Sequence, residues 1–223
     1  MRLGEDYGTF QVEDPEARPA RMTGKVFARD ESGNYSCSAT VVNSSTEKVI
    51  FTAAHCVRTK RWGWAKKFTF VSAYDRGDKP FGEWEWESLY VPTGWSGFKY
   101  DYAAVSLEKR NGKKIEDKVG GAGLVWNYNL NSEYLAFGFP FNYFNGERMM
   151  GCFSDLRDVD GNNDPAPFGI ECRMGGGSSG GGWLRDDHLA SVTSYGYDND
   201  LNTLYGPYFT NRARKFLDWV ERH

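Results

Sequence analysis

Residues 175–182 read GGGSSGGG, so six glycines enclose Ser178 and Ser179. Glycine adopts tight and left-handed turns at little cost, which lets such a stretch present backbone N–H groups free of side chains. A hydroxyl held on such a turn beside inward-pointing amides is what acyl-transfer chemistry requires. The alternative is a flexible Gly/Ser linker. The stretch is short and lies between a strand-like run and the bulky pair Trp183-Leu184, which favours the functional interpretation.

Around this stretch, short β-rich runs recur between clusters of Gly, Asn, Asp and Pro. Such a pattern is typical of an antiparallel sandwich or barrel. The runs lie at 25–28, 35–42, 48–52, 68–73, 84–91, 103–107, 134–139, 147–154, 168–173, 189–195 and 204–210.

Three segments interrupt the β-rich pattern. Residues 1–21 are polar and contain Pro15 and Pro19, which predicts an extended arm. Residues 108–121 are charged and contain glycine, which predicts a linker between two halves of the chain. Residues 158–167 (DVDGNNDPAP) predict an exposed loop.

The C-terminal segment predicts a helix. Asn211 can cap its first turn, and Phe216, Leu217 and Val220 then form one apolar stripe at helical spacing. A single amphipathic terminal helix is expected to pack back onto a barrel.

The composition limits the class of protein. Of the 223 residues, 40% are hydrophobic and 16% aromatic, which is enough apolar material for a core and excludes intrinsic disorder. The net charge of -3 argues against a nucleic-acid surface, which usually needs a basic excess. No apolar run approaches the ~20 residues of a membrane-spanning helix.

Four cysteines, Cys37, Cys56, Cys152 and Cys172, fit two disulfides and an oxidising compartment. Pairing within each half would close two short loops, worth ~3 kcal/mol each. No pair has the short spacing of a zinc knuckle, so a metal site is the poorer interpretation. The chain starts without an apolar signal region, and we expect a secreted, extracellular protein from which the export signal and any pro-segment are absent.

Three histidines are present, and His55 is the candidate for chemistry. It lies in TAAHC at 52–56, directly after an apolar run, and its neighbour Cys56 could pin the loop. His223 is the last residue and His188 lies in a polar turn, so both are expected at the surface. Imidazole is the side chain best suited to accept a hydroxyl proton near neutral pH.

Asp101 stands just before the apolar run Ala103-Ala104-Val105. Carboxylates are seldom fully buried without a partner. Facing an imidazole, Asp101 would fix its tautomer and stabilise the imidazolium that forms during reaction. Taken alone, an aspartate in this place is more often a strand-end residue.

Together the candidates follow the order His55, Asp101, Ser179, one of the known orders of a Ser-His-Asp triad. The sequence resembles the chymotrypsin-like (trypsin-fold) serine proteases, in particular their secreted bacterial and fungal branch. The matching stretches are TAAHC at 52–56, DYA at 101–103 and GSSGG at 177–181.

This resemblance implies an all-β fold of two six-stranded antiparallel β-barrels followed by a C-terminal α-helix. Residues 1–110 would hold an N-terminal extension and the first barrel, which carries His55 and Asp101. Residues 111–223 would hold the second barrel, which carries Ser179, and the helix.

The resemblance also implies a serine endopeptidase. Ser179 would attack the peptide carbonyl, and His55 would take its proton and deliver it to the leaving amine. The N–H groups of Gly177 and Ser179 would form the oxyanion hole. A Cys37–Cys56 disulfide would tie the loop that carries His55.

Substrate preference depends on Arg173 and Met174, which by position would lie near the base of the specificity pocket. Strand alternation would turn one of the two inward. An inward Arg173 would favour substrates with an acidic side chain before the cleaved bond. An outward Arg173 would leave Met174 as the apolar floor of the pocket. The favoured interpretation is a solvated or salt-bridged arginine. The pocket walls would be Ser194, Tyr195, Gly196 and Gly206.

The sequence departs from the family pattern at two places in the serine stretch. Ser178 stands where animal digestive members carry an aspartate that pairs with a newly cut N-terminus, so this activation switch is expected to be absent. Gly182 stands where members generally have proline, which predicts a looser turn after the nucleophile.

Two other functions compete with an endopeptidase. The GxSxG pattern around Ser179 also fits an α/β-hydrolase esterase, but in that fold the acid and the histidine follow the serine. The second is a catalytically disabled, protease-like adhesin or binding module. We expect a monomeric enzyme that acts on a protein or peptide substrate, with no cofactor and no metal, nucleic-acid or membrane partner.

Overall fold

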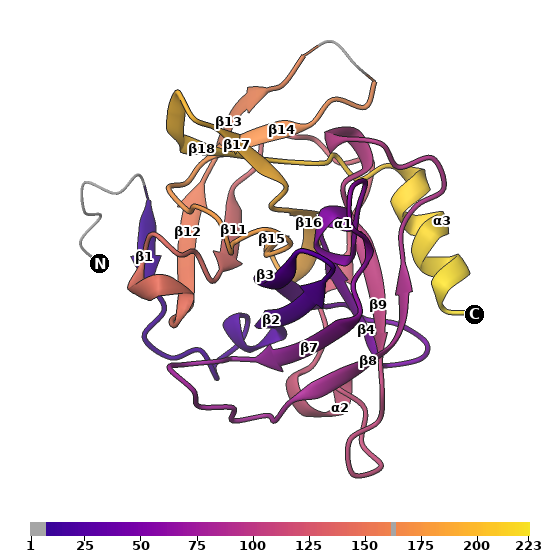
Figure 1. The fold of residues 1–223 in the computed structure, drawn as a ribbon. Coiled ribbons are helices and arrows are strands. Elements are labelled where there is room, and N and C mark those ends of the chain that lie inside the picture. The colour runs from indigo at the N-terminus through magenta and orange to yellow at the C-terminus, as the bar shows by residue number, and fades with distance from the viewer. Residues whose placement is uncertain (1–7, 162–163) are drawn as a thin grey trace.

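The computed structural model, which describes residues 8–161 and 164–223, consists mainly of β-strands and ends in one amphipathic helix (Figure 1). Most strands of the first half form one group, coloured purple to magenta, and strands of the second half form another, coloured orange to gold, which the N-terminal strand joins. The all-β barrel architecture predicted from the sequence is confirmed. Every run predicted as a strand overlaps a strand of the structure.

The first half forms a closed antiparallel barrel. Its strands are β2 (Thr23–Asp30), β3 (Gly33–Val41), β4 (Val49–Thr52), β7 (Lys67–Ser72), β8 (Trp84–Tyr90) and β9 (Ala103–Leu107). They pair in the order β2-β3-β4-β9-β8-β7. Fully buried residues such as Val26, Ile50, Phe70 and Val105 fill the barrel, because alternate side chains of each strand point inward. In the register of β2 with β3, Val26 lies opposite Cys37.

The second half contains a six-stranded sheet in the order β1-β12-β11-β15-β16-β10 and a four-stranded sheet in the order β13-β14-β18-β17. The pairs are antiparallel except for β10 with β16. The strands are β1 (Thr9–Gln11), β10 (Gly123–Leu124), β11 (Tyr134–Gly138), β12 (Met150–Ser154), β13 (Leu156–Val159), β14 (Phe168–Glu171), β15 (Gly182–Arg185), β16 (His188–Val192), β17 (Tyr195–Tyr197) and β18 (Asp200–Gly206).

The predicted N-terminal arm contributes a strand to the second half. Its residues 1–7 lie outside the described part, but Thr9 of β1 pairs with Cys152 of β12. Phe10 packs over Gly151 and stacks on Phe153. The arm therefore crosses from the first barrel to the sheet of the second half.

Short elements complete the chain. The segment 108–121, predicted as a linker, includes α2, whose Val119 is fully buried. These elements are α1 (Ala54–Val57), α2 (Glu116–Val119), β5 (Arg58–Thr59), β6 (Gly63–Trp64), and the 3-10 turns η1 (Ala20–Met22), η2 (Phe98–Tyr100) and η3 (Phe144–Gly146).

The terminal helix α3 (Asn211–Val220) forms as predicted, with a different cap. Thr210, not Asn211, is the N-cap: its hydroxyl accepts the N–H of Arg212 at 3.2 Å. Phe216 packs against Phe51 and Tyr102 of the first half, so the helix fastens the chain end to the first barrel. No helix in the described part is both long and apolar enough to cross a membrane.

Both predicted disulfides are present, Cys37–Cys56 and Cys152–Cys172. The second closes a loop with a sequence separation of 20. Replacing Cys152 and Cys172 together by serine should lower the free energy of unfolding by about 3 kcal/mol, since the unfolded chain regains that loop's freedom. A guanidinium titration checks this, and a midpoint equal to that of the unaltered protein would contradict it.

Candidate active site

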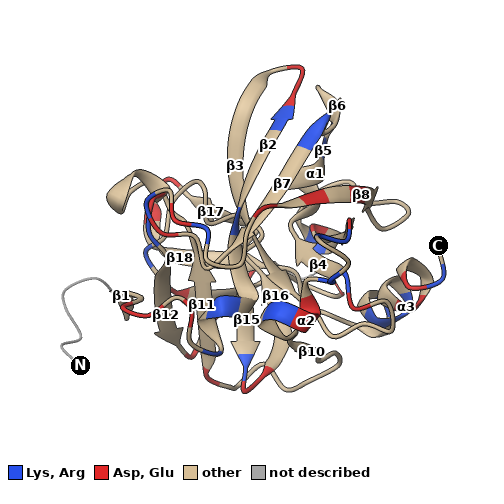
Figure 2. Cartoon of the chain, turned by 90° about the horizontal axis from the view of Figure 1, so that it is seen from below, with Lys and Arg blue, Asp and Glu red and all other residues tan. Residues whose placement is uncertain are grey.

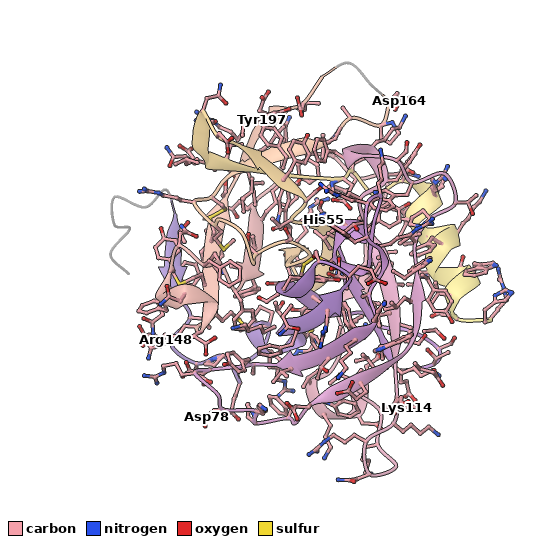
Figure 3. All side chains as sticks on the ribbon, viewed as in Figure 1. His55, Asp78, Lys114, Arg148, Asp164 and Tyr197 are labelled. Carbon is pink, nitrogen blue, oxygen red and sulfur yellow. A yellow bond between two sulfur atoms is a disulfide. The ribbon has the colours of Figure 1, made fainter. Side chains whose placement is uncertain are left out.

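His55 lies where the two halves of the molecule meet. It belongs to α1, directly after β4, and Figure 3 shows it near the centre of the view, between the purple and orange halves. The preceding Ala53 and Ala54 are fully buried, and the following Cys56 is bonded to Cys37 of β3. These contacts fix the backbone of α1, while 38% of the imidazole side chain remains exposed.

Asp101 is buried beside this imidazole. It follows η2, and only 2% of its surface is exposed. Its Oδ2 lies 2.6 Å from Nδ1 of His55, and its Oδ1 accepts the backbone N–H of His55 at 2.9 Å. The hydroxyl of Ser194 also donates to Oδ2, at 2.5 Å. Three hydrogen bonds thus satisfy a carboxylate that would otherwise be costly to bury.

Asp101 controls the protonation of His55. Burial alone would lower the pKa of His55, but the charge of Asp101 and its hydrogen bond outweigh burial and raise the pKa above its ordinary value. In neutral His55, Nδ1 donates to Asp101, which leaves Nε2 as the acceptor. The pair is therefore poised to take a proton at Nε2.

The two serines of the 175–182 stretch have different environments. Ser178 is 1% exposed, and its hydroxyl donates to the carbonyl of Gly175 at 2.6 Å. Ser179 is partly exposed and lines a cavity. Its carbonyl lies 3.7 Å from Sγ of Cys56, which places Ser179 next to the residue that follows His55. Within the described residues, no hydrogen bond joins the hydroxyl of Ser179 to the imidazole of His55.

Ser38 of β3 ties the serine loop to the first barrel. Its N–H donates to the carbonyl of Ser179 at 2.7 Å, and its hydroxyl donates to the carbonyl of Gly177 at 2.9 Å. The carbonyl of Ser38 in turn accepts the hydroxyl of Thr52, three residues before His55. The sequence did not reveal this role, because a serine inside a β-rich run carries no local signal.

Glycine is required at two positions of the loop. Gly177 has a φ of 93°, and a Cβ there would lie 2.5 Å from the carbonyl oxygen of Phe139. Gly180 has a φ of 81°, and a Cβ there would lie 2.0 Å from Oγ1 of Thr52. Within the described part of the chain, the N–H groups of Gly177 and Ser179 have no hydrogen-bond acceptor, while that of Gly180 donates to Thr193.

Gly182, from which the sequence predicts a looser turn after Ser179, is closely packed. This glycine begins β15, is buried, and donates its N–H to Oγ1 of Thr40 at 3.1 Å. A Cβ at Gly182 would lie 2.5 Å from that same oxygen. A proline would therefore lose the hydrogen bond and clash, since it has no N–H.

A cavity of about 500 Å³ opens beside Ser179. It brings together five of the six residues predicted to bind substrate: Arg173, Met174, Ser194, Tyr195 and Gly196. The described lining does not include Gly206, which is packed against Ser191 and Val192. The sequence did not point to other lining side chains, which come from the segment after β11 and from the region of β17 and β18: Asn142, Thr193, Tyr197, Asp198, Asp200, Leu201, Thr203 and Leu204.

Arg173 and Met174 lie just beyond the end of a strand and differ in exposure. β14 ends at Glu171, and the N–H of Arg173 donates to Oγ1 of Thr9 at 3.0 Å. Arg173 is exposed and Met174 is 3% exposed, and both contribute to the lining. One of the two residues is therefore exposed and the other buried, and the role of each in substrate preference stays a prediction.

Comparisons with known proteins give matches over nearly the whole chain. The protease Anisep from Arthrobacter nicotinovorans is 32% identical, with a TM-score of 0.88, over 96% of this chain and 100% of that structure. The thermostable serine protease AL20, from an extremophilic microorganism, is 31% identical, with a TM-score of 0.84, over 91% of this chain and 97% of that structure.

A curated relative matches over a shorter region, and no family model matches the chain. The protein named extracellular metalloprotease from Bacillus subtilis (strain 168) is 28% identical over 118 residues, 51% of this chain. The match spans only 36% of that relative's length. The near-complete matches to Anisep and AL20, together with the barrel architecture, show that the chain belongs to the chymotrypsin-like serine protease family.

Proposed function

We propose that this protein is a serine endopeptidase in which Ser179, His55 and Asp101 form the catalytic triad. The observation that carries the proposal is the buried carboxylate of Asp101, 2.6 Å from Nδ1 of His55. The imidazole of His55 stays partly exposed where the two halves meet, and Ser179 lines a cavity there. The α/β-hydrolase alternative is wrong, since the fold is all-β.

The reaction follows from these positions. Oγ of Ser179 attacks the carbonyl carbon of the peptide while Nε2 of His55 takes the hydroxyl proton. His55 passes this proton to the leaving nitrogen as the C–N bond breaks, which leaves an acyl-enzyme on Ser179. A water molecule then attacks the ester, gives a proton to Nε2 of His55, and the proton returns to Oγ of Ser179 as the acid leaves. Asp101 stabilises the imidazolium in both halves of the reaction without taking its proton.

The N–H groups of Gly177 and Ser179 would stabilise the oxyanion. Losing one such donor typically costs ~3–4 kcal/mol of transition-state stabilisation. Ser178 supports the loop from within, because its hydroxyl donates to the carbonyl of Gly175, two residues before Gly177. This internal bond would hold the loop in place. An aspartate at this position would instead need to pair with a newly cut N-terminus.

The substrate would be a protein or peptide, cleaved by a monomeric, extracellular enzyme. Two disulfides and a relative named as extracellular support this location. The cavity beside Ser179 would take the side chain that precedes the cleaved bond, against the apolar Met174.

The relative's name raises a metal-dependent mechanism as the second candidate, and the residues here do not fit one. Among the described residues, one His/Cys/Asp/Glu group has ligand atoms within 4.8 Å of one another: Cys37, His55 and Cys56. Both cysteines are joined in a disulfide, so neither offers the thiolate that a metal requires.

Inhibitors separate the two mechanisms. Phenylmethylsulfonyl fluoride should abolish hydrolysis of casein, because it sulfonylates the hydroxyl of an activated serine and releases fluoride. In contrast, 1,10-phenanthroline and EDTA should leave the initial rate within about twofold of the untreated enzyme. Loss of activity with the chelators and restoration by zinc would contradict the triad. Absence of hydrolysis under all conditions would favour the disabled binding module.

A further inference from the structure

The strongest local excess of positive charge lies just after His55. Between Glu47 and Asp75 the sequence contains no acidic residue, although the chain as a whole has a net charge of -3. Within that interval, residues 58–67 read RTKRWGWAKK, which places five cations and two tryptophans in ten residues.

The structure folds the first part of this stretch into a hairpin, β5–β6, which begins directly after α1. Arg58 pairs with Trp64, and the N–H of Trp62 donates to the hydroxyl of Thr59 in the turn. Figure 2 shows β5 and β6 at one end of the molecule, with blue segments on β5 and on the neighbouring β7. The hairpin therefore projects from the element that carries His55.

The hairpin's cations are unneutralised. Arg58, Lys60 and Arg61 are exposed, and none of them forms an ion pair with any other residue in the described ranges. An exposed cluster without internal partners raises the local concentration of anionic ligands and speeds their association.

Two exposed indole rings lie among these charges. Trp62 is 39% exposed with the guanidinium of Arg61 4.7 Å from its ring, and Trp64 is 42% exposed with that of Arg58 at 5.1 Å. Cation–π contacts hold each ring and charge together. Tryptophan and arginine are also the residues that most often dominate binding energy in protein interfaces.

A second hollow, of about 450 Å³, adjoins the hairpin. Its lining shares no described residue with the cavity beside Ser179. Four aromatic rings and one cation line it, and they come from the hairpin, the end of β8, the segment after β8, and α3. These five are Arg58, Trp64, Tyr90, Trp95 and Trp219.

We propose that this surface, the hairpin Arg58–Trp64 with its adjoining aromatic hollow, binds an acidic segment of the protein substrate outside the catalytic cleft. Carboxylates of the segment pair with Arg58, Lys60 and Arg61, and an aromatic or aliphatic side chain within it enters the hollow. That the ligand is a substrate rests on the endopeptidase function proposed above. A polypeptide offers both groups within a few residues, whereas a sulfated glycan offers charge without a side chain to fill an apolar hollow.

Paired fluorogenic peptides test this inference. All share one cleavable core and carry a tail on a Gly/Ser spacer, attached at either end of the core. The tail is acidic (EDEFEDE), neutral (QNQFQNQ) or acidic without the ring (EDESEDE). For the wild type, we expect the acidic tail to raise kcat/KM by roughly tenfold over the neutral tail, mainly through a lower KM and only at low salt. Replacing Phe by Ser in the tail should remove part of that gain.

The variant Lys60→Glu/Arg61→Glu should lose the preference for the acidic tail and cleave the neutral peptide at the wild-type rate. Lys109→Glu/Lys113→Glu is the matched control, since it changes the net charge equally on exposed residues of another segment and should keep the preference. Equal wild-type rates for acidic and neutral tails would overturn the inference. An equal fall in kcat/KM for the acidic-tail and neutral-tail peptides in the hairpin variant would also overturn it. Equal kcat/KM values for the Phe and Ser tails would show that the hollow does not bind the aromatic side chain.

Binding to Ser179→Ala separates this inference from the proposed function. Fluorescence anisotropy of the labelled acidic tail should show binding that depends on Lys60 and Arg61, whether or not the wild type cleaves peptides. If the wild type cleaves nothing and this binding persists, the surface stands and the endopeptidase function fails. If binding of a heparin hexasaccharide depends on Lys60 and Arg61 and the acidic tail does not bind, the ligand is a glycan and the inference is overturned.

Discussion

Replacing Ser179 by alanine is expected to lower kcat for a cleavable peptide by about 10⁶-fold, which leaves only the residual acceleration that the oxyanion hole and substrate binding supply. Without Oγ no acyl-enzyme can form, and His55 has no hydroxyl to deprotonate. The fold should be unaffected, because Ser179 is held through its carbonyl, which accepts the N–H of Ser38. Single-turnover kinetics and thermal unfolding of the same preparation check both expectations.

Ser178→Ala is the matched control, one residue away. Its hydroxyl is buried and donates to Gly175, so its loss should disturb the loop and lower kcat far less than the loss of Ser179. If Ser178→Ala were inactive and Ser179→Ala active, the nucleophile would be Ser178.

Asp101→Asn is expected to lower kcat by about 10⁴-fold, since the amide can hold His55 in the wrong tautomer. The pH profile should change as well. The base must be neutral, so activity falls as the pH drops through the pKa of His55, and Asp101 raises that pKa. Removing the carboxylate charge lowers the pKa of His55 and should move the acidic limb of kcat/KM to lower pH.

Asp30→Asn provides a comparison for this change. Asp30 is also buried, but its carboxylate accepts bonds from Ser32 at the end of β2. Its replacement should leave the acidic limb in place. A limb that stays fixed in Asp101→Asn, or moves to higher pH, would contradict the assigned role of Asp101.

Structural features that depend on a short stretch of sequence were predictable. The run 103–107 coincides with β9, Ala103–Leu107, because six consecutive non-charged residues separate Asp101 from a charged segment. The apolar stripe of α3 is buried as its spacing indicates. The two disulfides followed from the number and spacing of the cysteines.

Features that depend on distant segments meeting were not predictable. β1 is three residues long, and its partner Met150–Cys152 lies in the other half of the chain. The bond from Ser194 to Asp101 joins residues 93 positions apart. No local pattern indicates such contacts, since they form only when the two halves of the molecule pack together. Thr210 and Asn211 are both good caps, and the backbone path alone decides between them.

Tandem mass spectrometry after reaction with a fluorophosphonate tests the triad most directly, because this reagent modifies only a serine activated by a neighbouring base. We predict one adduct, on Ser179, in the wild type and none in His55→Ala. An adduct on Ser178, or no adduct in a preparation that hydrolyses casein, would contradict the assignment.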